Sequence, residues 1–484
     1  MAFLTEAANR GSISTGYNID NSIKVQANSG NEWFYRDNPT AGNKRTFTFS
    51  FWMKRTQLDG YQADNYLMSQ GTNARFHFAG HTLRFMFDGN STEMEAAGKL
   101  RDTSAWYHIV LAVDTTQSTN TNRVKAYLNG EVYPFNNSDW PSLNQESSWM
   151  SGTDMYFNTR DGDGSYDNSG YWSEVAVVDG QQLDPTSFGE FDEDSGIWKP
   201  KDLSDITFGS EGFYLKFDNS GSLGADSSGN SNNVTLNNIA AANQATDTPT
   251  NNFCTINLPF EPYVGSPPTI TEGATVMTGG ASGQQDSYGT MALFKGKWYF
   301  EFSVLNVGGL AIYNMYGGVV KVNRLLQSSY NNAANGHHSH DGGWGGNAYA
   351  VGYHAGSSSG FTSVSGAAVD TVIGVAVDMD NGKIWWSSQG TYASSSGNVS
   401  NPATATLPQF TNLLTQYPGE PVVPAFNHYV HQASTQGAFN FGGYQDHAFT
   451  DIGTNSDANG YGSFAYTPPS GYYAICSKNL AEYG

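Results

Sequence analysis

The residues of this sequence that could do chemistry lie in loops rich in Gly, Asn, Asp and Ser. In the stretch DGDGSYD, oxygen-bearing side chains recur at alternate positions: Asp161, Asp163, Ser165 and Asp167. Oxygen ligands of this kind suit Ca²⁺. An EF-hand would need Gly at the sixth position and Glu at the twelfth, where this chain has Tyr166 and Trp172. The stretch is therefore either a calcium loop of another kind or a solvated acidic turn, and the second interpretation is favoured.

Histidines gather in the stretch HHSHDGGWGG, at His337, His338 and His340. Imidazole groups are ligands for transition metals, and a three-fold oligomer could build a metal site from one such loop per chain. No second half of a metal motif is evident in the sequence. Incidental histidines in a Gly-rich loop are therefore the favoured interpretation.

Carboxylates also alternate in GEFDEDSG, at Glu190, Asp192 and Asp194, close to the E-x-D-x-E signature of family 16 glycoside hydrolases. Retaining glycosidases hold two carboxyl groups about 5–5.5 Å apart. Here the third acid is Asp, and the preceding LDPTSFG is typical of a turn. No nucleophile elbow, P-loop or dinucleotide fingerprint is found. We expect no enzyme, with a polysaccharide depolymerase as the alternative.

Aromatic residues set among short polar ones form the last candidate group. Rings that stack on sugars, together with polar groups that bind hydroxyls, would make a glycan site. The candidate glycan-binding residues are Trp140, Trp149, Tyr156, Tyr166, Tyr171, Trp344, Tyr349 and Tyr353. For any one of them, packing on its own sandwich or on another subunit is the favoured interpretation.

Short alternating strands must position these loops. Residues 106–130 predict a hairpin whose inner face carries Tyr107, Ile109, Leu111, Val113, Val124, Ala126 and Leu128. Further strands are predicted at 22–25, 45–54, 65–70, 74–79, 82–88 and 170–179, and a second hairpin at 371–390. No segment keeps a 3.6-residue apolar period, so helices should be few and short.

Composition excludes several classes of protein. The 44 acidic and 23 basic residues among 484 give a net charge of −21, which argues against binding nucleic acid. No apolar run of about 20 residues occurs, so we expect no membrane insertion, and the start MAFLTEAANRGS shows no secretory signal. Cys254 and Cys476 are expected to be buried free thiols, with a single bridge as the alternative.

Two resemblances follow from particular motifs. FTFSFWMKR, WYHIVLAVD, NRVKAYLNG and YWSEVAVVDGQQLDPTSFGEFDEDSGIWKP resemble a laminin G-like, concanavalin A-like jelly-roll domain of marine bacteriophage virion proteins, over about residues 12–200. The segments FGSEGFYLKFDNSGSLGADSSGNSNNVT and DTPTNNF also look like those phage proteins. KWYFEF, IGVAVDMDNGKIWW, VVPAF and FNFG are similar to the SPRY domain, from which the long insertion at about 308–361 departs.

We therefore expect an all-β protein with two tandem antiparallel β-sandwiches, laminin G-like and then SPRY-like. The expected organisation is an N-terminal arm at 1–12, a first sandwich at 13–217, an Asn/Gly/Ser-rich connector at 218–252 and a second sandwich at 253–484.

The resemblance implies a bacteriophage virion surface protein, made in the host bacterial cytoplasm, such as a tail fibre, receptor-binding or head-decoration component. It would bind host surface polysaccharide or neighbouring virion proteins. The resemblance further implies a homo-oligomer, with a trimer favoured, and Ca²⁺ in a rim loop as the candidate cofactor. A purely structural virion subunit is the other alternative.

Overall fold

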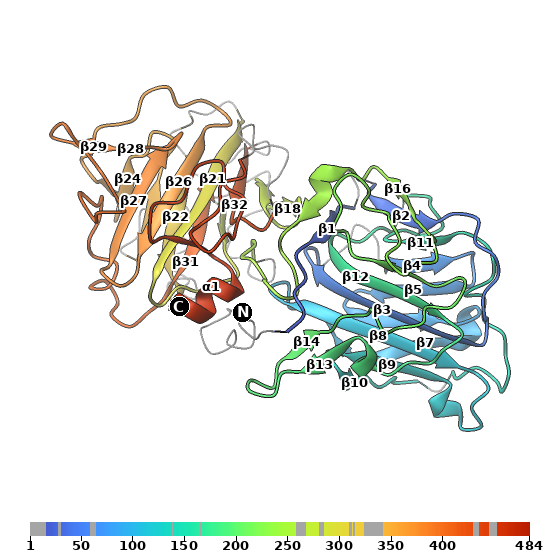
Figure 1. Cartoon of the computed structure of the whole chain (residues 1–484). Coiled ribbons are helices and arrows are strands. Elements are labelled where there is room, and N and C mark those ends of the chain that lie inside the picture. Colours follow the sequence, from blue (N-terminus) through green and yellow to red (C-terminus); the bar gives the residue numbers. More distant parts are fainter. Residues whose placement is uncertain are drawn as a thin grey trace. The chain divides into compact units, whose positions relative to one another are not determined.

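The computed structural model describes residues 16–27, 31–58, 64–137, 139–164, 166–257, 268–279, 285–308, 312, 315–323, 342–428, 435–444 and 453–484 (Figure 1). Within these residues the regular secondary structure is almost entirely β-strand. It divides into two compact units, one of Ser14–Thr250 and one that holds Asn251–Gly484. We call them the first and second sandwich. The predicted all-β fold class is confirmed.

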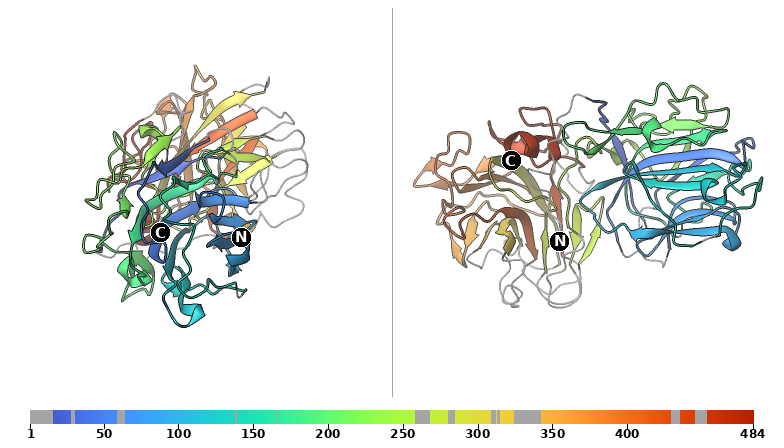
Figure 2. Two further views of the ribbon diagram at one scale, coloured as in Figure 1. Left: turned by 90° about the vertical axis from the view of Figure 1, so that its right-hand side faces the viewer. Right: turned by 90° about the horizontal axis from the view of Figure 1, so that it is seen from below.

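The first sandwich, coloured blue to green in Figures 1 and 2, contains two large sheets. Its eight-stranded sheet has the order β10 (Glu131–Val132), β9 (Val124–Leu128), β8 (Trp106–Asp114), β3 (Thr46–Arg55), β12 (Gly170–Asp179), β1 (Ser22–Val25) and β17 (Gln244–Ala245), with β15 (Phe213–Leu215) paired to β12. Its seven-stranded sheet has the order β16 (Thr235–Asn237), β2 (Trp33–Arg36), β11 (Met155–Phe157), β4 (Asp64–Gln70), β5 (Ala74–Ala79), β6 (Thr82–Met86) and β7 (Glu93–Lys99).

The predicted hairpin at 106–130 is confirmed as β8 and β9, with Leu111 opposite Ala126. Its inner side chains all join the main core of the first sandwich, as the alternation predicted. The opposite face is covered as well, because Val110 and Ala112 pack in a second, smaller core beneath the segment that follows β12. A small hairpin in that segment pairs β13 (Gly189–Phe191) with β14 (Trp198–Pro200).

Residues 218–252 are not a connector, so that predicted boundary is wrong. β16 pairs with β2 in one sheet and β17 pairs with β1 in the other. Leu223 and Val234 belong to the main core. The Asn- and Ser-rich composition of this segment reflects loops that close one edge of the first sandwich, and the unit extends to Thr250.

The second sandwich repeats this construction. Its eight-stranded sheet has the order β18 (Thr269–Thr271), β19 (Val276–Thr278), β32 (Thr435–Asn440), β21 (Lys297–Val307), β26 (Val372–Asp378), β27 (Lys383–Ser388) and β28 (Thr391–Tyr392), with β33 (Tyr473–Ala474) paired parallel to β21. Its six-stranded sheet has the order β20 (Gln285–Tyr288), β31 (Val422–His428), β22 (Met315–Lys321), β23 (Gly343–Gly346), β24 (Gly352–His354) and β25 (Ser357–Ser358).

β26 and β27 confirm the predicted hairpin at 371–390. A further small hairpin pairs β29 (Ser394–Ser395) with β30 (Asn398–Val399). The described helices are short, as expected: α1 (Ser477–Tyr483) and the 3₁₀ turns at Asn90–Thr92, Asn120–Asn122, Pro185–Ser187 and Ala241–Asn243. None of the helices described is long and apolar enough to cross a membrane.

Cys254 and Cys476 are both buried thiols that are not bridged to each other, which confirms the favoured prediction. Their backbones are close, because Cys254 N–H donates to the Ile475 carbonyl. The two thiols nevertheless face different sides of the second sandwich, since Cys254 packs in its main core and Cys476 in a separate outer cluster.

Candidate binding face

A cluster of three aromatic rings lies on the outer face of the seven-stranded sheet. Trp33 and Tyr35 come from β2 and Tyr156 from β11, while the alternating residues Phe34 and Phe157 point inward and are wholly buried. The rings of Tyr35 and Tyr156 stack with centroids 5.2 Å apart, and the Trp33 ring lies 5.3 Å from Tyr35 and 5.6 Å from Tyr156. All three side chains are partly exposed. We call them the aromatic patch.

Polar groups surround the aromatic patch. Strand register places Thr235 opposite Tyr35 and Asn237 opposite Trp33 on the edge strand β16. The Tyr156 hydroxyl donates to the Asp154 carboxylate at 3.2 Å. Burial and the charge of Asp154 raise the pKa of Tyr156 to about 12, so its hydroxyl is a neutral donor at neutral pH. Flat apolar faces beside hydroxyl and amide groups are the surface that a sugar ring needs.

We call the stretch Asp161–Asp167 the acidic loop. Its residue Gly162 lies against Tyr156 of the aromatic patch. Gly162 has φ of +73°, and a Cβ there would lie 2.6 Å from the Tyr156 ring. The Asp161 N–H donates to the Ser69 hydroxyl of β4 at 2.9 Å, which fixes the start of the loop to the sheet. The close approach of the loop to Tyr156 therefore requires glycine at position 162.

Two side chains of the acidic loop carry buried oxygens that the described residues do not satisfy. Asp167 is 6% exposed, and neither of its carboxylate oxygens makes a well-aligned hydrogen bond to the described residues. Burial raises the pKa of Asp167 to about 6, which the nearby Thr159 hydroxyl only partly offsets. Burial likewise raises the pKa of Asp161, whose Oδ1 also lacks a partner in the described part of the chain.

These oxygens have the hard chemistry that Ca²⁺ prefers. The amide oxygen of Asn158, next to the loop, is buried and lacks a hydrogen-bond partner among the described residues. Asp163, in contrast, points to solvent. No three carboxylate, imidazole or thiol side chains in the described ranges converge as a metal site. The three-carboxylate constellation predicted from the sequence is therefore not formed as such.

Several of the predicted glycan-binding aromatics are core residues, and for these the prediction is wrong. Trp149, Tyr171 and Trp344 are wholly buried and offer no ring face to a ligand. The Trp149 indole N–H donates to the Met86 carbonyl at 2.9 Å. Trp344 stacks on His354 with centroids 4.8 Å apart. For these three rings the favoured interpretation, packing on their own sandwich, is confirmed.

The other predicted aromatics do not form one site. Trp140 packs edge-on against Phe135 at the margin of the main core of the first sandwich. Tyr166 lies beneath the Arg160 guanidinium, with 5.3 Å from its carbon to the ring centroid. Tyr349 and Tyr353 are partly exposed but belong to the second sandwich. Of the eight, Tyr156 is the one that joins the aromatic patch.

Sequence reasoning missed Trp33 and Tyr35. Their signal was present, because WFYR between polar residues is a short strand with alternating faces. The predicted metal ligands His337, His338 and His340 lie outside the described residues.

The glycosidase-like carboxylates are engaged in holding a turn. Lys199 Nζ lies 3.4 Å from Glu190 Oε1 and 3.2 Å from Asp192 Oδ2. Asp192 Oδ1 accepts from the Ser195 N–H and hydroxyl, both at 2.9 Å. These contacts close the β13–β14 hairpin. The turn predicted from LDPTSFG is confirmed as the 3₁₀ turn Pro185–Ser187.

The buried contact between Ser50 and His108 does not activate the Ser50 hydroxyl as a nucleophile. His108 is 1% exposed, and its Nδ1 accepts the Trp198 indole N–H at 2.9 Å. The neutral ring therefore carries its proton on Nε2, which donates to the Ser50 hydroxyl at 2.9 Å. Burial lowers the pKa of His108 to about 3. His108 cannot take a proton from Ser50, because the nitrogen that faces the hydroxyl is already protonated.

Part of the first sandwich is similar to a known superfamily of proteins. Residues 28–180 match the concanavalin A-like lectin/glucanases superfamily. That segment contains the whole aromatic patch and the acidic loop. No curated protein sequence matches the chain.

Solved structures similar to the chain include three of low identity. The SPRY domain of human HERC1 is 15% identical, with a TM-score of 0.26, over 36% of this chain and 91% of that one. A candidate carbohydrate binding protein from Bacteroides ovatus is 19% identical, with a TM-score of 0.32, over 46% of this chain and 59% of that one. A heptameric SAP-like pentraxin from Limulus polyphemus is 12% identical, with a TM-score of 0.27, over 46% of this chain and 98% of that one.

Proposed function

We propose that this protein acts by binding a saccharide on the aromatic patch of its first sandwich. The observation that carries the proposal is the partly exposed cluster of Trp33, Tyr35 and Tyr156, flanked by hydroxyl and amide groups. The match of residues 28–180 to a superfamily of lectins and glucanases supports it. Binding is favoured over catalysis, because the carboxylates of Glu190 and Asp192 are tied to Lys199 in a turn.

We place this activity on the surface of a bacteriophage virion, as a tail fibre, receptor-binding or head-decoration component made in the host bacterial cytoplasm. The support is the resemblance of the motifs in the first half to marine phage proteins. The partners would be host surface polysaccharide, other virion proteins and further copies of this chain, with a trimer favoured. The net charge of −21 gives no long-range attraction to an anionic envelope, so recognition would act at short range.

We also propose that the acidic loop binds Ca²⁺. The support is that buried oxygens of Asp167, Asp161 and Asn158 have no hydrogen-bond partner among the described residues, and a cation would offset the unfavourable burial of the carboxylates. Ca²⁺ should then raise the melting temperature of the wild type. Ca²⁺ should not raise the melting temperature of the Asp167→Asn variant. Without Ca²⁺ this variant should be more stable than the wild type, because it buries no carboxylate at position 167. Equal Ca²⁺ responses in calorimetry would contradict this assignment.

The proposed function is tested by measuring glycan binding of the full chain on an array, followed by calorimetry with the best ligand. Trp33→Ala and Tyr35→Ala should each weaken binding about tenfold, because each removes a stacking face. Phe191→Ala is the matched control, since Phe191 is 44% exposed on the β13–β14 hairpin, away from the seven-stranded sheet. Equal affinities for all three variants and the wild type would overturn the proposal.

A depolymerase is the second candidate, because Glu190 on β13 and Asp192 directly after it carry carboxylates at alternate positions. The Glu190→Gln/Asp192→Asn double variant separates the two functions. We expect neither the wild type nor the variant to shorten host polysaccharide in a size-exclusion assay. Cleavage by the wild type that the double variant lacks would establish an enzyme instead.

A further inference from the structure

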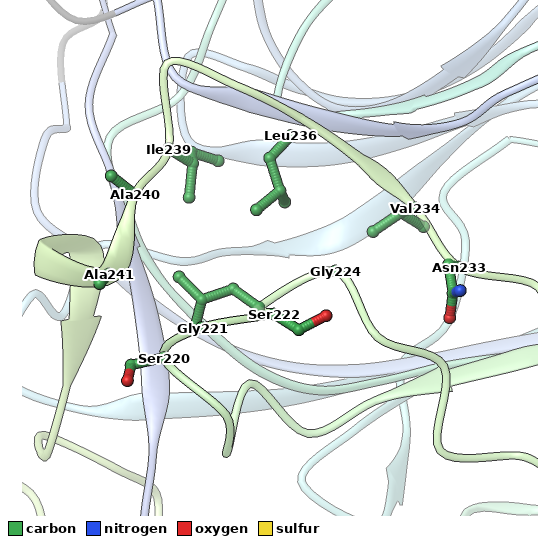
Figure 3. A pocket seen from close by; sticks show the side chains of 11 residues that line it. Ser220, Gly221, Ser222, Gly224, Asn233, Val234, Leu236, Ile239, Ala240 and Ala241 are labelled. Atoms are coloured by element: carbon green, nitrogen blue, oxygen red, sulfur yellow. The ribbon is translucent and has the colours of Figure 1, made fainter.

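A pocket of about 290 Å³ opens at one edge of the first sandwich, in the segment that follows β15. Figure 3 shows the side chains of Val234, Leu236 and Ile239 on one wall, with Ser220 and Ser222 across from them. Leu236 and Ile239 are partly buried and pack against the main core. The pocket is therefore an opening into the apolar interior with hydroxyls at its rim.

The lining decides what kind of group could enter. It contains no charged residue and no aromatic ring, so it suits neither an ionic group nor a stacked sugar ring. Its volume is at the lower limit for small-molecule sites, about 300 Å³. Aliphatic walls of this size fit a small uncharged substituent, such as a methyl or acyl group, attached to a polar body.

The pocket and the aromatic patch share the edge strand β16. Leu236 faces the pocket, while its neighbours Thr235 and Asn237 face outward beside Tyr35 and Trp33. Neighbouring strands are about 4.8 Å apart, so a sugar held on the patch has its substituents within one sugar unit of the edge. A ligand on the patch can therefore reach the pocket around β16.

The edge of β16 adds hydrogen-bonding groups. β16 pairs with β2 on one side and is the last strand of its sheet. Its other side presents backbone N–H and C=O groups, and the described residues contribute no further strand there. An amide offers one donor and one acceptor to such an edge, whereas a bare methyl or ester lacks the donor.

We infer that the pocket receives the acetamido group of an N-acetylated sugar, with its methyl on Leu236 and Ile239 and its amide on the edge of β16. This inference rests on the proposed function, because the rest of the saccharide would lie on the aromatic patch. It adds a substrate class, namely N-acetylhexosamine-containing glycans.

The test uses two uncharged probes that differ only at C2, the β1,4-linked tetramers of N-acetylglucosamine and of glucose, titrated calorimetrically into the full chain. The N-acetylated tetramer should bind about tenfold more tightly, from one buried methyl and one added hydrogen bond. Ile239→Trp, which fills the pocket, and Ile239→Ser, which makes it polar, should each abolish that preference. Tyr156→Ala should weaken both tetramers equally.

The outcomes separate this inference from the proposed function. Equal affinity for both tetramers, or an undiminished preference in both Ile239 variants, would overturn the pocket assignment and leave the saccharide site standing. No binding of either tetramer, together with a glycan array that shows no ligand, would overturn both. A single cooperative thermal transition of the first sandwich, together with retained binding of the glucose tetramer, serves as the check that the Ile239 variants fold.

Discussion

At the scale of single residues, buried polar groups of this protein hold segments of the chain together. Glu174 has φ of +51° within β12, at an irregularity in its pairing with β3. Its carboxylate accepts from the hydroxyls of Tyr214 and Tyr17. Such a group secures the start of the described chain to the eight-stranded sheet and contacts no candidate site.

Glu174 predicts a pH dependence of stability. Burial raises its pKa from 4.5 to about 7, so the native state holds a proton that the unfolded state has lost. Its contribution is therefore fully present below about pH 4.5 and is lost as the pH rises through 7, by a few kcal/mol. Urea unfolding of the wild type should show this fall between pH 4.5 and 7.

The Glu174→Gln variant should make that profile flatter for the first sandwich. Glu301 is the matched control in the second sandwich, because burial raises its pKa to about 7 as well. Glu301→Gln should flatten only the transition of the second sandwich. A Glu174→Gln profile as steep as that of the wild type would contradict the assignment.

At the scale of elements, long alternating strands were predictable and short edge strands were not. β3 and β8 each bury one face in the main core, and every second residue of their sequences is an apolar core residue. β16 and β17 contain three and two residues and take their conformation from the strands beside them. Local sequence carries little information about such strands, so β16 and β17 were missed, and with them the polar groups of β16 beside the aromatic patch.

The β13–β14 hairpin is held on the eight-stranded sheet by a close approach at the turn after β9. Gly130 has φ of +83°, and a Cβ there would lie 2.3 Å from the Trp198 ring. Gly180 has the same φ, but a Cβ there would have no neighbouring atom within 4 Å. Substitution of Gly180 therefore measures the cost of the backbone conformation without a steric clash. Gly180→Ala should lower the unfolding free energy by about 1 kcal/mol.

Gly130→Ala should lower it by at least about 2 kcal/mol, because the ring must also move. The measurement is chemical unfolding of both variants against the wild type. Trp198 fluorescence should shift in Gly130→Ala alone. Equal losses for the two variants would show that the contact with Trp198 contributes nothing.

At the scale of the whole molecule, two sandwiches of the same general construction differ in the segments between their strands. Composition alone suggested a connector at 218–252, since Asn, Ser and Gly are typical of linkers. Leu223 and Val234 show why that failed, because two apolar side chains in a polar segment were enough to bind it to the core. The pocket is lined by this segment, and β16 of the segment lies beside the aromatic patch.

The boundary at Thr250 gives a direct prediction for fragments. Residues 14–250 should fold with one cooperative thermal transition, because all strands of both sheets are present. Residues 14–217 should fail to do so, since β16, β17 and the core side chains of Leu223 and Val234 are missing. Circular dichroism and amide exchange would compare them. A cooperative transition in the shorter fragment would show that residues 218–252 are a connector after all.

The central claim is that saccharide binding lies on the aromatic patch of the first sandwich. The most direct measurement is calorimetric titration of the best array ligand into Tyr156→Ala and Tyr353→Ala. Both are partly exposed tyrosines that contact another aromatic ring, in the first and second sandwich respectively. We expect about a tenfold loss of affinity for Tyr156→Ala and none for Tyr353→Ala. Wild-type affinity in Tyr156→Ala, or a loss confined to Tyr353→Ala, would contradict the account.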